Sequence, residues 1–182
     1  MTPAKLGLPL QNRLARLAWQ FIHCALVRFT PRPLHAWRAL VFRLCGARLG
    51  ARCHIYPGAI IWAPWNLECD DDACIASGAE IYNVGLVTIG KRAVVSQGAY
   101  LCGATHDYSD ASRAEFPLVS APIRIGDCAW VAARAIVLPG ISIGEGCVIG
   151  AGSVVTRDMP AHSVCACNPC RVIKFTTDAR PA

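Results

Sequence analysis

The segment from residue 100 to 130 interrupts an otherwise regular sequence and carries a histidine followed directly by an aspartate, His106 and Asp107. A histidine side chain titrates at about pH 6.5, so it can take a proton from a hydroxyl group near neutral pH. Asp107 could orient the imidazole, or it could simply begin a turn. His106 is therefore a candidate general base, with a solvated loop histidine as the alternative, provided that a rigid framework holds the segment.

Eleven cysteines are the second group of residues that could do chemistry. Most are scattered singly, which is not the spacing of a small disulfide scaffold, and in a reducing compartment such cysteines serve as small buried hydrophobes. Cys165, Cys167 and Cys170 stand close together in CACNPC. Zinc usually takes four ligands, and no second CxxC pair completes the set, so we expect no metal cofactor.

The framework that must hold the histidine is a repeat of large aliphatic residues spaced by six. Leu101 and Ile125, on either side of the interruption, are 24 positions apart and keep the same register. A period of six fits neither a helix nor a long amphipathic strand. It predicts an all-β solenoid in which three hexads close one triangular coil, and each coil stacks on the next by parallel strand pairing. The aliphatic positions are Leu49, Ile55, Ile61, Leu67, Ile75, Ile81, Ile89, Val95, Leu101, Ile125, Val131, Val137, Ile143, Ile149 and Val155.

Small residues accompany this repeat. Ala, Cys or Ser stands two positions before most of the aliphatic residues, and we expect these near the corners of each coil, where space is short. Gly follows several of the aliphatic residues, as at 49–50 and 89–90, and we expect it to provide turn angles that other residues resist. Two steps of eight residues, at DDDACI and VGLVTI, are predicted to be corner bulges.

Residues 1–46 form a separate, basic arm. Nine bases precede the first acid of the chain, Glu68, so this end could attract nucleic acid, an anionic membrane surface or acidic ligands. Two apolar stripes with helical spacing predict two amphipathic helices joined at TPRPL. These helices could cap the open end of the solenoid or lie on an anionic bilayer, and the two roles are compatible. The stripes consist of Leu14, Leu17, Ala18, Phe21, Ile22, Ala25 and Phe29, then Leu34, Trp37, Val41 and Leu44.

Composition narrows the remaining classes of function. The basic residues form no recognised reading motif, so we expect no nucleic-acid partner. No apolar run reaches the roughly 18 residues of a membrane span, and the N-terminus lacks a clean signal-peptide core. We therefore expect a cytoplasmic protein. The basic arm would also allow it to contact the inner face of the membrane.

The C-terminal part of the repeat carries a family resemblance. It contains IGAGSVVTRDMP and NPCRVIK, which are similar to the IGAGSVVTKDIP and GNPARVIK of the hexapeptide-repeat acyltransferases. ATHDYSD and the N-terminal GLPLQNRLARLAW further resemble one branch, the colanic-acid-biosynthesis-type sugar O-acetyltransferases, so the resemblance spans nearly the whole chain. It implies a left-handed parallel β-helix at 47–165 with an inserted loop at 103–122. The N-terminal α-helical arm at 1–46 and a C-terminal tail at 166–182 complete the expected organisation.

The resemblance implies transfer of an acetyl group from acetyl-CoA to a sugar hydroxyl, in exopolysaccharide or related glycoconjugate synthesis. The family's general base is the histidine of the corresponding loop, and ATHD assigns that role to His106. Asn83 and Asp107 are the expected acceptor contacts, although an Asn at a bulge is also ordinary turn chemistry. A non-catalytic β-helix that binds or scaffolds other molecules is the alternative.

The resemblance also implies a homotrimer with acetyl-CoA in a groove between two subunits. His106 and Trp130 of one site are then expected from two chains, and the acceptor is a sugar or a lipid-linked sugar. Cys167 and Cys170 replace the usual Gly and Ala and add bulk near the donor. Basic side chains opposite the CoA phosphates are physically expected, although they are also ordinary surface charges. The positions that match the family's donor contacts are Trp130, Ala133, Ala151, Thr156, Arg157, Arg171 and Lys174.

Overall fold

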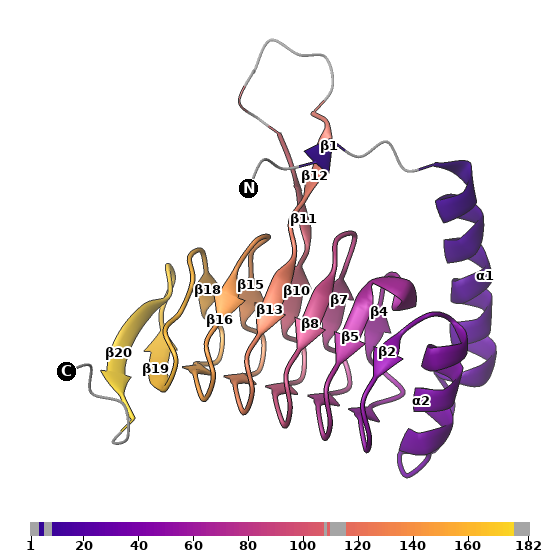
Figure 1. Cartoon of the computed structure of the whole chain (residues 1–182), viewed down its shortest axis with the longest axis horizontal. Coiled ribbons are helices and arrows are strands. Elements are labelled where there is room, and N and C mark those ends of the chain that lie inside the picture. The colour runs from indigo at the N-terminus through magenta and orange to yellow at the C-terminus, as the bar shows by residue number, and fades with distance from the viewer. Residues whose placement is uncertain (1–3, 6–8, 108, 110–115, 177–182) are drawn as a thin grey trace.

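Short parallel strands stack into a three-sided prism, with two helices across its N-terminal end and a hairpin projecting from one edge (Figure 1). The structure, a computed structural model, describes residues 4–5, 9–107, 109 and 116–176. Its architecture is the parallel β-solenoid that the repeat predicts, with the N-terminal helical arm that the two apolar stripes predict.

Each face of the prism is one sheet, and the chain visits the faces in a fixed order. The first face holds β2 (Arg48–Leu49), β5 (Leu67–Cys69), β8 (Val87–Ile89), β13 (Ile123–Ile125) and β16 (Ser142–Ile143). The second face holds β3 (His54–Ile55), β6 (Cys74–Ile75), β9 (Val94–Val95), β14 (Trp130–Val131), β17 (Val148–Ile149), β19 (Ser163–Ala166) and β20 (Arg171–Phe175). The third face holds β4 (Ile60–Ile61), β7 (Glu80–Tyr82), β10 (Tyr100–Cys102), β15 (Ile136–Val137) and β18 (Val154–Val155).

The interior of the prism is filled by the aliphatic residues of the repeat. Ile81, Leu101 and Val131 have no exposed surface, because successive residues of a strand point to opposite sides of the sheet. The small residues two positions earlier, such as Ala79 and Ala99, are also fully buried. Both predictions from the spacing are therefore confirmed for these positions.

One of the two predicted bulges lies elsewhere. Strand pairing aligns Leu49 with Cys69 and Cys69 with Ile89, so Cys69 occupies the aliphatic position of its coil. The extra residues precede it, around the 3-10 turn η1 (Pro64–Asn66), and the prediction of a bulge at DDDACI was wrong. The physical reason is that a small cysteine fills a position that the other coils give to a large aliphatic side chain. The step at VGLVTI does lie at a corner, between β7 and β8.

The glycines that follow the aliphatic residues serve a different purpose from the predicted one. Gly50, Gly90 and Gly126 do not have a positive φ. A Cβ at any of them would lie 2.6–2.7 Å from a backbone nitrogen of the next coil, so close approach excludes a side chain there. The left-handed backbone occurs two residues later, at Arg52, Arg92 and Cys128.

The interruption folds as a hairpin at the edge between the third and first faces (Figure 1). Its strands β11 (Ala104–His106) and β12 (Leu118–Ser120) pair antiparallel, and β1 (Ala4–Lys5) adds a third strand beside β12. The backbone nitrogen of Gly103 donates to the carbonyl of Tyr82 at 2.8 Å, which attaches the base of the hairpin to the preceding coil. Residues 108 and 110–115 of the predicted loop lie outside the described part of the chain.

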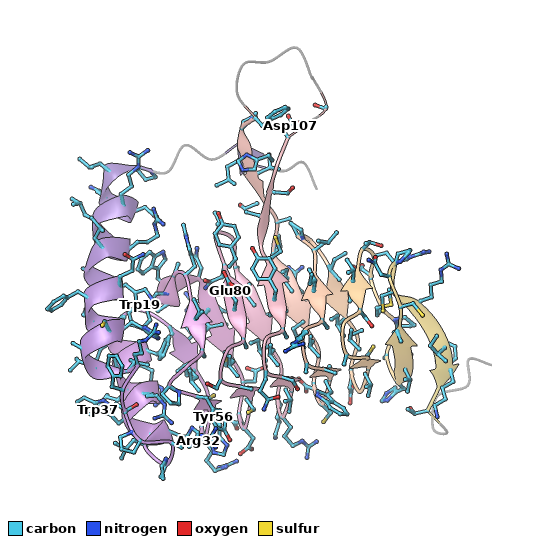
Figure 2. All side chains as sticks on the ribbon, turned by 180° about the vertical axis from the view of Figure 1, so that it is seen from behind. Trp19, Arg32, Trp37, Tyr56, Glu80 and Asp107 are labelled. Carbon is cyan, nitrogen blue, oxygen red and sulfur yellow. The ribbon has the colours of Figure 1, made fainter. Side chains whose placement is uncertain are left out.

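The arm consists of α1 (Leu10–Leu26) and α2 (His35–Leu44), and both helices pack on the first coil. Trp19 lies on the side of α1 that faces the prism, and its indole N–H donates to the carbonyl of Ile61 at 2.8 Å (Figure 2). Arg38 of α2 is fully buried and donates to the carbonyl of Ile55 at 2.6 Å. The same guanidinium donates to two carbonyls of the segment between the helices. A single cation therefore joins α2, the connecting segment and the first coil.

The arm caps the prism, but most residues of its predicted apolar stripe point away from the prism. Leu14, Leu17 and Phe21 are 57%, 62% and 76% exposed, whereas Trp19 is 3% exposed. Of the predicted stripe residues in α2, Val41 is buried and Trp37 is not. The helical spacing was therefore predicted correctly, but it does not identify which side of the helix meets the prism.

The predicted C-terminal tail is in part a strand. β20 pairs antiparallel with β19 and ends the second face, so residues 171–175 belong to the prism. Residues 177–182 of the predicted tail lie outside the described part of the chain.

Candidate active site

His106 is the last residue of β11 and stands on the projecting hairpin. Its side chain is exposed, and its Nδ1 lies 2.7 Å from the carbonyl oxygen of Phe116. A carbonyl oxygen only accepts hydrogen bonds, so the neutral ring carries its proton on Nδ1 in this contact. The lone pair is then on Nε2, which is the arrangement that a general base requires.

Asp107 follows at the start of the hairpin turn, at the outer end of the hairpin in Figure 2. Its Oδ1 accepts hydrogen bonds from the backbone nitrogen of Ser109 at 3.0 Å and from the Ser109 hydroxyl at 2.6 Å. The backbone nitrogen of Asp107 donates to the carbonyl of Pro117 at 2.9 Å. These contacts favour the turn-forming role, one of the two roles that the sequence leaves open.

Asn83 is buried at the edge from which the hairpin leaves, with no exposed surface. Its Oδ1 accepts from the backbone nitrogen of Ala63 at 2.9 Å, and its Nδ2 donates to the carbonyl of Ala63 at 2.6 Å. The side chain thereby completes the backbone hydrogen bonding of the preceding coil. This position favours a structural role over the expected contact with an acceptor, and the bonds of the side chain join two coils rather than residues of one turn.

Three of the predicted donor residues lie on or beside the second face. Trp130 projects from β14, is 48% exposed, and donates from its indole N–H to the hydroxyl of Ser96 at 2.8 Å. Ala133 and Ala151 occupy successive turns between the second and third faces, where the backbone nitrogen of Gly152 donates to the Ala133 carbonyl. The two alanines therefore form part of one edge that has little side-chain bulk.

The other four predicted donor residues lie in the last coils and are exposed. Thr156 and Arg157 follow β18, on the same edge as the hairpin and two coils further along the prism. Arg171 and Lys174 lie on β20. The structure thus places these four residues in two groups near the C-terminal end of the prism.

Within one chain, the structure does not bring His106 and Trp130 together. The hairpin leaves the prism between the third and first faces, whereas Trp130 projects from the second face. In a three-sided prism that edge and that face are on opposite sides. A site that contains both residues would need two chains, as the resemblance implies.

An aromatic and basic cluster beside the hairpin was missed by the sequence reasoning. The guanidinium of Arg16 lies 4.2 Å above the ring of Trp62, and Trp62 meets Tyr82 edge to face with ring centroids 5.6 Å apart. The backbone carbonyl of Tyr82 accepts the hydrogen bond from the N–H of Gly103 at the base of the hairpin. A signal was available, because Trp62 and Tyr82 each follow an inward aliphatic residue and are 20 positions apart, one coil in this region.

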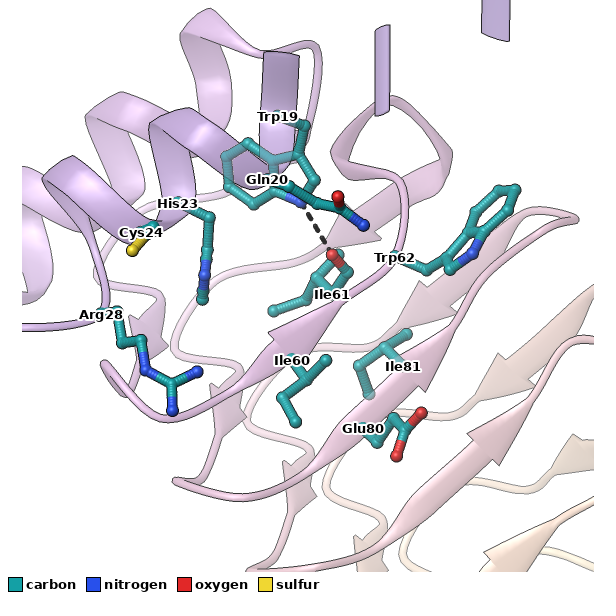
Figure 3. Close-up of a pocket in the computed structure, with 10 residues that line it drawn as sticks. All are labelled: Trp19, Gln20, His23, Cys24, Arg28, Ile60, Ile61, Trp62, Glu80 and Ile81. Atoms are coloured by element: carbon teal, nitrogen blue, oxygen red, sulfur yellow. Dashed lines mark hydrogen bonds between the residues drawn. The ribbon is translucent and has the colours of Figure 1, made fainter. Parts of the chain in front are cut away.

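A cavity of about 340 Å³ lies between α1 and strands β4 and β7 (Figure 3). Trp19, His23 and Arg28 line it from the arm, and Ile60 and Glu80 line it from the third face. Burial lowers the pKa of His23, whose Nε2 contacts a backbone carbonyl of the first coil. None of the residues predicted from the sequence for the site lines this cavity.

The cysteines of the last coils pack against one another. The Sγ atoms of Cys147 and Cys165 are 3.9 Å apart, and the hydroxyl of Ser163 lies between them at 3.4 Å and 3.2 Å. Burial raises the pKa of the Cys147 thiol to about 12, so this sulfur stays protonated and unreactive at neutral pH. Within the described ranges, no group of three or more His, Cys, Asp or Glu side chains is placed to hold a metal ion.

The sequence matches known transferases. Residues 122–157 match the family model "Bacterial transferase hexapeptide (six repeats)". The chain is 37% identical over 163 residues to "Putative colanic acid biosynthesis acetyltransferase WcaF" of Escherichia coli strain K12. That alignment covers 90% of this chain and 88% of the relative.

Solved structures share the architecture. A maltose O-acetyltransferase from Clostridium difficile 630 superposes with a TM-score of 0.83 at 26% identity, covering 92% of this chain and 89% of that one. A galactoside acetyltransferase in complex with coenzyme A superposes with a TM-score of 0.86 at 25% identity, covering 95% and 86%. The predicted fold class, a left-handed parallel β-helix with an N-terminal helical arm, is confirmed.

Proposed function

The chain belongs to the hexapeptide-repeat acetyltransferase family, and we propose that it transfers an acetyl group from acetyl-CoA to a sugar hydroxyl in the synthesis of an exopolysaccharide or a related glycoconjugate. The support comes from the relative named "Putative colanic acid biosynthesis acetyltransferase WcaF" and from the solved structures of a maltose O-acetyltransferase and of a galactoside acetyltransferase in complex with coenzyme A. A sugar acceptor and a CoA thioester donor fit all three names.

The observation that carries the proposal is the contact between His106 Nδ1 and the carbonyl of Phe116. With the proton held on Nδ1, Nε2 takes the proton of the sugar hydroxyl as its oxygen attacks the thioester carbonyl. The tetrahedral intermediate then collapses, the carbon–sulfur bond breaks, and the imidazolium returns the proton to the departing CoA thiolate. His106 ends the cycle neutral, and the acetyl ester and free CoA are the products.

We further propose a homotrimer, because the outward residues of the three faces differ in chemistry. Polar side chains project from the first face, while the other two faces project mainly apolar ones. A closed ring of three chains can cover the apolar third face and the part of the second face beside it. The outward rows are Arg48, Glu68, Thr88, Arg124 and Ser142 on the first face, then His54, Cys74, Val94, Trp130, Val148 and Val164 on the second, and Ile60, Glu80, Tyr100, Ile136 and Val154 on the third.

In such a trimer, the third face of each chain turns toward the ring axis. The edge between the third and first faces of one chain then meets the edge between the second and third faces of its neighbour. The hairpin with His106, at the edge of the third face, is then next to the neighbour's face that carries Trp130. Ala133 and Ala151 leave room along their edge for the narrow pantetheine arm of acetyl-CoA. The donor's phosphates would be held by the exposed polar and basic residues of the last coils, Thr156, Arg157, Arg171 and Lys174.

The acceptor side of the site is proposed at the base of the hairpin. Trp62 and Tyr82 present aromatic surface at this edge, and the apolar face of a sugar ring packs on such surface. Arg16 adds a cation above Trp62 that can donate hydrogen bonds to sugar or acidic oxygens. Asn83 supports this edge from the interior, and Asp107 shapes the turn beyond His106.

The first test is calorimetric titration of the protein and of His106→Ala with acetyl-CoA. We expect saturable binding near one site per chain in both proteins, because His106 acts on the acceptor. Release of CoA thiol in the presence of maltose or a galactoside should then occur only with the unaltered protein. Absence of binding at millimolar acetyl-CoA would overturn the proposal and favour a non-catalytic scaffold.

A further inference from the structure

The outer side of the helical arm is apolar, where the solvent side of a capping helix is normally polar. Leu10, Leu14, Leu17 and Phe21 follow the spacing i, i+4, i+7 and i+11, so they form one stripe along α1. Their side chains are 70%, 57%, 62% and 76% exposed. The amphipathic pattern of α1 is thus the reverse of that expected from a helix that only covers a core.

The inner side of α1 makes its own contacts with the prism. Trp19 is buried there with its N–H on a carbonyl of β4, and His23 Nε2 lies 3.2 Å from the carbonyl of Ala59. Arg16 stacks on Trp62 from the same side. Packing of the arm on the prism therefore does not use the outer stripe, which has to be explained separately.

The second helix extends the apolar surface. Trp37, Leu40 and Leu44 of α2 are 42%, 47% and 78% exposed, while Phe42 on the inner side is fully buried. Phe29, between the helices, is 79% exposed. In Figure 2 Trp37 lies on the side of the arm away from the prism. The outer arm surface, as we call it, consists of Leu10, Leu14, Leu17, Phe21, Phe29, Trp37, Leu40 and Leu44.

The charge of the arm indicates what covers this surface. Arg13 and Arg32 are exposed on the arm, and no acidic residue precedes Glu68 in the chain. Exposed apolar side chains with arginines around them and no acid fit an anionic lipid surface, where the apolar groups enter the acyl boundary and the cations meet phosphates.

The place of the surface in the fold favours a membrane over a second copy of the chain. The arm crosses the end of the prism, whereas the second and third faces run along its sides (Figure 1). Neighbours packed through the sides leave the end uncovered, and cyclic symmetry would turn three such ends toward the same side. In the ranges that the structure describes, no helix is long and apolar enough to cross a bilayer, so the helices would lie on it.

We propose that the outer arm surface docks the protein on the surface of an anionic lipid bilayer. The two helices lie in the interface, with the outer apolar side chains below the headgroups and Arg13 and Arg32 at the level of the lipid phosphates. The proposal rests on the arm and on the proposed packing of neighbours through the sides of the prism, and not on acetyl transfer. Lipid binding and catalysis can therefore fail independently.

Flotation of the full-length protein with lipid vesicles tests this inference. Vesicles of phosphatidylcholine are compared with vesicles that contain about one third phosphatidylglycerol. We expect binding to the anionic vesicles that weakens as salt is raised. The double variant Leu14→Gln/Phe21→Gln should bind at least about tenfold more weakly, because two large side chains lose their burial in lipid.

Ile173 provides a matched control, since it is 58% exposed on β20 at the other end of the prism. Ile173→Gln makes the same apolar-to-polar change and should leave vesicle binding unaltered. Arg13→Gln/Arg32→Gln should weaken binding to anionic vesicles by about fivefold per base and reduce its salt dependence.

Two results would overturn the proposal. One is the absence of binding to anionic vesicles. Equal binding by the unaltered protein and by Leu14→Gln/Phe21→Gln counts in the same way, provided that the variant keeps the circular dichroism and melting temperature of the unaltered protein. The other is a particle whose mass falls when the outer residues are replaced, because the surface would then be covered by a second copy of the chain. Acetyl-CoA binding measured on the same samples shows whether the proposed transferase function stands or falls separately.

Discussion

The coils and the hairpin are continuous in the chain, yet different forces hold them. Leu101 and Ile125, on either side of the hairpin, are buried, and their strands pair in parallel with the coils before and after them. On the hairpin, His106 is exposed and is held by its contact with the Phe116 carbonyl and by antiparallel pairing with β12. The coils therefore supply stability, and the hairpin supplies a positioned side chain that contributes little to stability.

The largest expected effect comes from a substitution on the hairpin, and it is an effect on activity. His106→Gln should lower kcat by about 10²–10⁴-fold, because the sugar hydroxyl loses its proton acceptor. The melting temperature should stay within about 2 °C, since an exposed side chain contributes little to stability. CoA release with a sugar acceptor measures the rate, and His162→Gln, in a turn of the last coil, is the control. Equal activity of the two variants would remove His106 from the mechanism.

A substitution inside the coils should lower stability and leave substrate binding unchanged. Leu101→Ala removes a fully buried aliphatic side chain and should lower the free energy of unfolding by about 2–5 kcal/mol, with KM for acetyl-CoA unaltered in the folded fraction. Urea unfolding gives the value, and Ile173→Ala at an exposed position should cost less than about 0.5 kcal/mol. A similar cost at both positions would show that the prism interior is not the source of stability.

Asn83 lies between the two regions and tests which of them it serves. Asn83→Ala leaves the backbone N–H and carbonyl of Ala63 without their present partner, which should destabilise the fold by about 1–3 kcal/mol. KM for the sugar should change little in the folded protein. A variant with unaltered stability and a much higher KM for the sugar would instead make Asn83 an acceptor ligand.

A smaller gain in stability is expected at Cys167, which has a φ of +89°. This backbone region is strained for residues with a Cβ, and the family pattern has Gly at this position. Cys167→Gly should therefore raise the free energy of unfolding by about 1 kcal/mol, as measured by thermal unfolding. Cys24→Gly, inside α1, makes the same change in a helix and should destabilise the protein.

The smallest expected effect is a loss of stability at low pH, caused by two histidines of the arm. Burial lowers the pKa of His23, and burial together with Arg38 and His54 lowers the pKa of His35, below the ordinary value of 6.5. The unfolded chain then takes up protons at a higher pH than the folded chain, so stability is full above about pH 6.5 and falls as the pH drops below it. Thermal unfolding between about pH 7 and 5 should show this decline, and His23→Gln should make it shallower. A decline of the same size in the variant would exclude His23 as a cause.

Much of the fold could be predicted from the sequence because many positions of the repeat indicate the same solenoid. Each inward aliphatic residue repeats the same information, so one exception, Cys69, moved a bulge without changing the architecture. The direction of the arm could not be predicted in the same way. Helical spacing defines a stripe, but it does not say whether the prism or another surface covers it, and here Leu14 and Phe21 face outward.

The site was only partly predictable, for a related reason. His106 stands out because it lies in the break of the repeat, and its contact with Phe116 supports the assigned chemistry. Asn83 matched a family position by residue type, but its burial against Ala63 depends on how two coils stack. Trp62 and Tyr82 were missed because their pairing appears only when the coil length of 20 residues in this region is known.

In the proposed trimer, each active site combines the hairpin of one chain with the donor surface of its neighbour. Co-expression of His106→Ala chains with Ala133→Trp chains tests it most directly, since each variant alone should be inactive. Random mixing in a trimer would pair an intact hairpin with an intact donor surface at about a quarter of the sites. If the sites form between chains, CoA release should return to about a quarter of the unaltered rate in the mixed trimers. Mixed trimers as inactive as either variant alone would contradict it, because the site would then lie within one chain.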